Sequence, residues 1–71
     1  MKYYNFYNTI TLEVISGQDM RQTRDIANGW IEEGDNVKYA ITNKALHEMA
    51  TPPILKDYRK GMHLNNKEVQ Q

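Results

Sequence analysis

The chain has 71 residues and no cysteine, and its nine basic side chains balance nine acidic ones. It therefore has no disulfide framework and no thiolate metal site, and it lacks the net positive charge that drives sequence-independent binding to nucleic acids. No apolar stretch approaches the roughly eighteen residues that span a bilayer, so the composition predicts a soluble cytoplasmic protein.

The first fifteen residues alternate between apolar and polar positions, which predicts one long strand with a single apolar face. Every even-numbered position from Tyr4 to Val14 is apolar except Asn8. The chain has no second segment long enough to pair with all of this strand, so we expect a homodimer that extends the sheet through it. The alternative is a hairpin that turns about Asn8.

A helix is predicted from Asp19 to Glu33, where apolar residues recur with helical spacing. Asp19 is suited to cap its start, and Gly34 is suited to end it. Gly29 lies inside this helix and costs about 0.5–1 kcal/mol relative to alanine, so we expect another element to approach the backbone closely there. The predicted apolar stripe consists of Met20, Thr23, Ile26, Ala27, Trp30 and Ile31.

Three further elements are predicted in the second half of the chain. Alternation over 37–42 indicates a second strand, and the segment between the two strands is long enough for a parallel crossover. A short helix is expected to follow, capped by Thr42 or Asn43 and ending at Ala50. Because proline suits the first position of a helix, a third helix is predicted over 52–60.

These elements predict an α+β fold, a small β-α-β-α-α domain over residues 1–65. The long N-terminal strand belongs to a small sheet that the helices cover on one side. Two strands do not make a stable sheet by themselves, so dimerisation is expected to complete it. Residues 66–71 are predicted to form a mobile C-terminal tail.

The sequence contains no complete motif for catalysis or for metal or cofactor binding. His47 and Glu48 begin like the zinc-binding sequence H-E-x-x-H, but Thr51 stands where the second histidine would be. The glycines form no phosphate-binding loop, and the single serine, Ser16, lies at a predicted turn. We therefore predict that the protein is not an enzyme and that it has no catalytic residue, no metal and no cofactor.

Two features favour binding to another protein. Two tyrosines lie on the polar side of the predicted strand, and tyrosine is enriched at protein interfaces. On the predicted helix, two arginines near the start and two glutamates near the end oppose the helix dipole. Contact with a partner would explain these charges, and the alternative is that their small cost is tolerated at exposed positions. We predict a protein-binding module that acts as an inhibitor or adaptor of a larger protein, as phage and mobile-element accessory proteins often do. The contact candidates are Tyr3, Tyr7, Arg21, Arg24, Glu32 and Glu33.

The alternative hypothesis is a small nucleic-acid-binding regulator. Lys56, Arg59 and Lys60 form a basic patch on the third predicted helix, and the two short helices loosely resemble a helix-turn-helix. The balanced total charge and the intervening Asp57 weaken this interpretation. Protein binding is therefore the first hypothesis.

Overall fold

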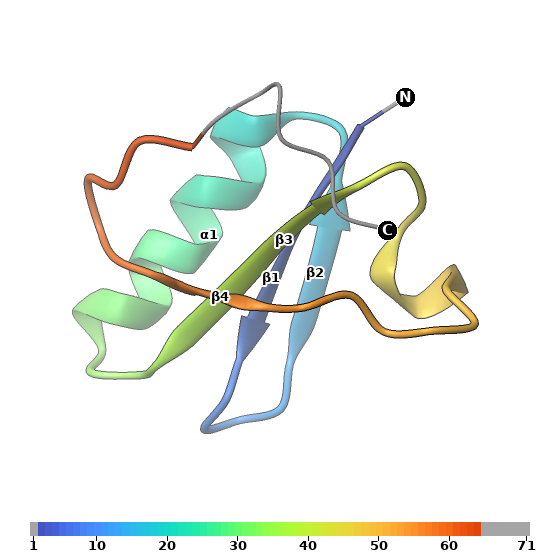
Figure 1. The fold of residues 1–71 in the computed structure, drawn as a ribbon. Coiled ribbons are helices and arrows are strands. Elements are labelled where there is room, and N and C mark those ends of the chain that lie inside the picture. The colour runs from blue at the N-terminus through green and yellow to red at the C-terminus, as the bar shows by residue number, and fades with distance from the viewer. Residues whose placement is uncertain (1, 65–71) are drawn as a thin grey trace.

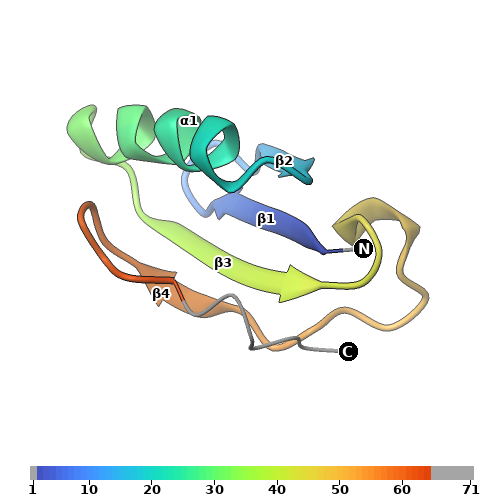
Figure 2. The ribbon, with the colours of Figure 1, turned by 90° about the horizontal axis from the view of Figure 1, so that it is seen from above.

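The structure is a computed structural model that describes residues 2–64 of the chain. One antiparallel sheet of four strands carries a single α-helix on one face (Figures 1 and 2). Within the described residues, no helix has the length and apolar character needed to cross a membrane. The elements in chain order are β1 (Tyr3–Asn8), β2 (Val14–Gly17), α1 (Met20–Glu32), β3 (Val37–Thr42), the 3-10 helix η1 (Leu46–Glu48) and β4 (Lys56–Tyr58).

The predicted long first strand is a hairpin, so the alternative turn about Asn8 is the one that forms. Strands β1 and β2 pair in antiparallel register from Tyr4 opposite Gly17 to Tyr7 opposite Val14. The Asn8 side chain makes the turn, because its Oδ1 atom accepts hydrogen bonds from the backbone amides of Ile10, at 2.9 Å, and Thr11, at 3.2 Å. Asparagine favours such turns, and the single polar interruption in the apolar alternation marked the place.

The hairpin changes the arrangement of the whole sheet. The strand order is β2-β1-β3-β4, so β1 has a partner on each side and no free edge. Strand β3 runs antiparallel to β1, not parallel as a crossover connection would require. The predicted β-α-β-α-α fold is therefore wrong. Strand β1 itself cannot extend the sheet into a second copy, and the predicted homodimer stays a prediction.

The core lies between the sheet and α1. Strand alternation directs Phe6 and Tyr39 toward the helix, and Tyr58 of β4 joins them. Phe6 is 1% exposed, and its ring meets that of Tyr58 edge to face at a centroid distance of 5.0 Å. We call the opposite side of the sheet the open face. Residues outside this sheet complete the core, since Ala27 and Leu64 are also buried.

Helix α1 forms where the sequence predicts it, with the predicted residues at both ends. The Asp19 side chain accepts hydrogen bonds from the amides of Arg21 and Gln22, at 3.0 and 3.3 Å, and so caps the first turn. Gly34, just past the other end, has φ of +93°, a conformation that favours glycine. The expected close approach at Gly29 is not found, because nothing in the described chain lies within 4 Å of a Cβ built there.

The two helices predicted for the second half of the chain are wrong. The segment predicted as the first contains only the short η1, and the segment predicted as the second contains β4, which pairs antiparallel with β3. Pairing decides the outcome at β4, because it buries Tyr58 against Phe6, and such tertiary contacts override a weak local helix preference. The predicted tail at 66–71 lies outside the described residues.

The position of Tyr58 predicts a loss of stability in alkaline solution. Burial raises the pKa of its phenol above 10.0, against the opposing effect of Arg24. A raised folded-state pKa means that the stability is complete below pH 10.0 and is lost as the pH rises through the folded value. Denaturant unfolding at a series of pH values across this range should show that the free energy of unfolding falls, and that it falls less in Tyr58→Phe. An identical decline in the variant would contradict the prediction.

Candidate protein-binding surface

The six predicted contact residues do not form one surface. Tyr3 and Tyr7 are half-buried on the open face, whereas the four charged candidates belong to α1 or follow it directly, on the other side of the sheet. Arg24 is half-buried near the Tyr58 phenol, while Arg21 is exposed. A single partner footprint cannot centre on all six, so the structure separates the tyrosines from the helix charges.

The charges at the end of α1 have an explanation within the chain. Glu32 forms an ion pair with Lys60, which comes from the turn after β4. Both side chains are more than half exposed, so the pair is worth at most about 1 kcal/mol. Even so, an intramolecular partner removes the need for an external one at Glu32. Glu33 is exposed at the end of the helix.

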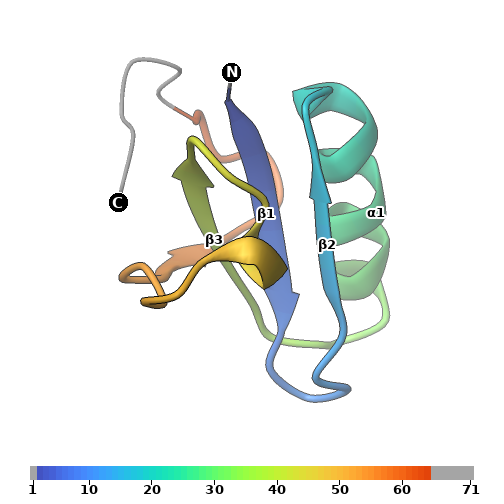
Figure 3. The ribbon, with the colours of Figure 1, turned by 90° about the vertical axis from the view of Figure 1, so that its right-hand side faces the viewer.

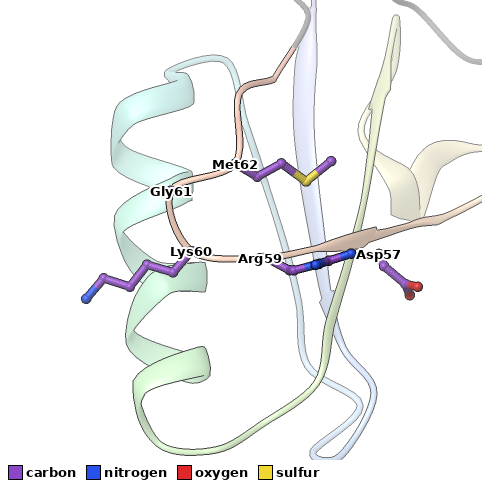
Figure 4. Close-up of a pocket in the computed structure, with 5 residues that line it drawn as sticks. All are labelled: Asp57, Arg59, Lys60, Gly61 and Met62. Atoms are coloured by element: carbon purple, nitrogen blue, oxygen red, sulfur yellow. The ribbon is translucent and has the colours of Figure 1, made fainter.

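The basic residues of the alternative hypothesis lie on a strand and a turn, not on a helix. Figure 4 shows the shallow pocket of about 380 Å³ that includes Arg59 and Lys60. Lys60 points away from it, and the acidic Asp57 is part of its lining. The Lys38 Nζ atom donates a hydrogen bond to Asp57 Oδ1 at 2.9 Å, and this contact lowers the pKa of the Asp57 carboxyl group. The expected resemblance to a helix-turn-helix is therefore wrong. Nucleic-acid binding by Lys56, Arg59 and Lys60 stays a prediction that rests on their charge alone.

The hairpin carries the densest group of exposed apolar side chains in the described chain. Ile10 is 65% exposed and Leu12 is 66% exposed at the hairpin tip, and Val14 is 44% exposed at the start of β2. Val14 also borders an apolar pocket of about 200 Å³ on the open face. We call these three residues and the pocket the hairpin surface. The pocket is lined by Tyr7, Val14, Leu46, Met49, Pro52, Pro53 and Leu55.

Asn5 holds the outer wall of this pocket in place. It is 1% exposed, on the open face, and its Oδ1 atom accepts hydrogen bonds from the Leu46 amide, at 3.0 Å, and from the Ser16 hydroxyl, at 2.6 Å. Its Nδ2 group donates to the Ala40 carbonyl at 2.9 Å and to the Thr42 hydroxyl at 2.8 Å. One side chain thus ties three strands to the segment that contains η1, which lies in front of β1 in Figure 3.

Sequence reasoning placed Asn5 on a polar face and missed this role. The available signal was its position, because asparagine is depleted in strands and here stands between Tyr4 and Phe6 at mid-strand. A polar residue in such a place requires hydrogen-bond partners if it is buried. The alternation pattern alone could not say that a later segment would cover it.

Leu12 is held in a backbone conformation that its side chain disfavours. Its φ is +67°, the single positive value among the described residues other than glycine. Clash of the Cβ atom with the backbone makes this conformation cost about 1–2 kcal/mol for an ordinary residue. The leucine gains little burial in return, because its side chain is 66% exposed. A glycine or asparagine would suit the turn better, so stability of the fold does not explain this residue.

Residues 2–64 contain no cluster of three or more histidine, aspartate or glutamate side chains placed to hold a metal ion. Comparisons with protein-family models, with curated proteins and with solved structures gave no match. The chemistry of the hairpin surface is therefore the basis for assigning a function.

Proposed function

We propose that the protein is a non-enzymatic protein-binding module that acts as an inhibitor or adaptor of a larger protein, and that it binds this partner through the hairpin surface. The observation that carries the proposal is Leu12, a bulky apolar residue kept exposed in a strained conformation. Backbone strain of this kind clusters at functional sites, ligand-binding positions among them.

The chemistry of the surface indicates what the partner supplies. Ile10, Leu12 and Val14 offer apolar area, with Glu13 as the charged residue between the last two, and Tyr7 lines the adjoining pocket. Apolar anchors that fill pockets dominate the energetics of protein interfaces, whereas exposed charges contribute little. We expect the partner to insert an aliphatic or aromatic side chain into the pocket and to cover Leu12. Binding should therefore depend weakly on salt.

Leu12→Gly tests the proposal by separating stability from binding. The substitution relieves the backbone strain, so unfolding in denaturant should show a gain of about 0.5–1 kcal/mol. The same variant should bind the partner at least about tenfold more weakly, because it deletes a central apolar contact. The partner is to be identified by photo-crosslinking from position 12 and then purified for calorimetric titration.

Asp25→Asn is the control, because Asp25 is exposed on α1 and lines neither the pocket of the hairpin surface nor the other space that Val14 borders. Its affinity for the partner should equal that of the unmodified protein. If Leu12→Gly gains stability and yet keeps its full affinity, the hairpin tip is not part of the interface and the proposal fails.

A further inference from the structure

The two edges of the sheet differ in how they are protected. Strand β4 has three residues, and Lys56 and Asp57 at this edge are exposed. Charged residues and short length are ordinary means of preventing an edge from pairing with another chain. Strand β2, at the other edge, has the sequence Val-Ile-Ser-Gly, with neither a charge nor a proline. This edge lacks the protection that the first one has.

The register identifies which backbone groups of β2 face outward. The Asn8 amide donates to the Glu13 carbonyl at 2.9 Å, which makes Asn8 and Glu13 a hydrogen-bonded pair. Hydrogen-bonded and non-bonded pairs alternate along an antiparallel ladder, so Ile15 and Gly17 direct their backbone groups to β1. The amides and carbonyls of Val14 and Ser16 therefore point away from the sheet.

A groove of about 490 Å³ lies along this edge, between β2 and α1. Ile26 contributes to it from the helix and is 45% exposed. Gln22, Ile26 and Gly29 share one strip of α1, since they are four and then three residues apart. Gly29 leaves this strip bare, with nothing in the described chain within 4 Å of a Cβ built there. The destabilising mid-helix glycine thus lies beside the unprotected edge.

We propose that a second copy of this chain pairs with β2, antiparallel, about a two-fold axis at Ile15. This symmetry sets Val14 opposite Ser16 of the second copy and Ser16 opposite its Val14, so the outward amides and carbonyls satisfy one another. No like charges meet at the axis, because the groove residues other than His47 are not ionisable. The arrangement is self-complementary, which favours a second copy over an unrelated strand.

The helices also fit this arrangement. Helix α1 packs mainly on β1 and β2, and Figure 3 shows it beside β2 at the margin of the sheet. Two such helices would lie about two strand spacings apart, roughly 10 Å, which is the distance of directly packed helices. They run antiparallel, so Ile26 of one copy packs over Gly29 of the other. The dimer does not rest on the proposed partner. Val14 is the residue that the β2 groove shares with the hairpin surface, and the dimer uses its backbone groups.

Sedimentation velocity over a range of concentrations tests the dimer. The unmodified protein should sediment as a dimer in a range where Ile26→Lys is monomeric, with the dissociation constant raised at least about tenfold by the paired charges. Ile54→Lys is the matched control, because Ile54 is 80% exposed and outside the groove, and it should dimerise normally. A monomer at all concentrations up to about 1 mM would overturn the proposal.

Amide hydrogen exchange locates the interface and guards against a misfolded variant. Protection of the Val14 and Ser16 amides should rise with protein concentration in the unmodified chain and should not rise in Ile26→Lys. A dimer with both amides unprotected, or protection only after the hairpin-binding partner is added, would refute pairing of two copies at this edge. Leu12→Gly should leave dimerisation unchanged, so failure of the dimer and failure of the proposed function are distinguishable.

Discussion

Asn5→Ala should lower the free energy of unfolding by about 3–5 kcal/mol, a large part of the total stability of so small a domain. Truncation deletes the acceptor of the Leu46 amide and the Ser16 hydroxyl and the donor to Thr42. Each buried polar group left without a partner costs about 1–3 kcal/mol. Chemical denaturation monitored by the fluorescence of Trp30 provides the measurement.

Asn28→Ala is the matched control for Asn5→Ala. Asn28 is also an asparagine, but the hydrogen bond that it accepts from the Tyr58 hydroxyl joins only two elements. Its replacement should therefore cost about 1 kcal/mol. Equal costs for the two substitutions would show that the Asn5 network does not anchor the segment around η1.

Phe6→Ala should cost about 3–5 kcal/mol and leave the domain mostly unfolded at 37 °C, if its total stability is near the lower end for its size. Phe6 is 1% exposed and packs its ring against both Tyr39 and Tyr58. Removing it leaves a cavity where β1, β3 and β4 meet. Thermal unfolding by circular dichroism would measure the loss.

Phe6→Leu provides the comparison, because leucine keeps most of the apolar volume and should cost less than the alanine variant. Tyr3→Ala provides a second comparison, since Tyr3 is an aromatic residue of the same strand that is half-buried on the open face. A small effect of Phe6→Ala, comparable with that of Tyr3→Ala, would mean that the aromatic cluster is not the centre of the core.

Local signals in the sequence were sufficient for the helix and for β3. Asp19 caps the start of α1 and Gly34 follows its end, as predicted, because capping depends on a few neighbouring backbone groups. The alternation over 37–42 likewise marks a strand that the structure contains. The predicted apolar stripe of the helix was correct at Thr23 and Ala27, which are buried, and wrong at Ile26, which is 45% exposed.

The errors came from contacts between distant parts of the chain. Strand β4 exists because Lys56–Tyr58 pairs with β3, which no local propensity reports. The hairpin was visible only as the polar Asn8 in an otherwise regular alternation, and a long strand fitted the same pattern. The candidate site depends on both, so sequence analysis found Tyr7 and missed Asn5 and Leu12. A positive φ at a leucine has no sequence signature.

The hairpin-side pocket has one wall on the sheet and the other on the segment after β3, and this construction limits what can enter. A side chain too wide for the gap between these two walls has to push that segment outward, which strains the hydrogen bond from the Leu46 amide to Asn5. The sheet ladder would remain intact, because none of its strands forms the displaced wall. The segment that contains η1 would thus limit the size of the group that enters the pocket. Mutations that remove its hydrogen bond to Asn5 should admit bulkier groups.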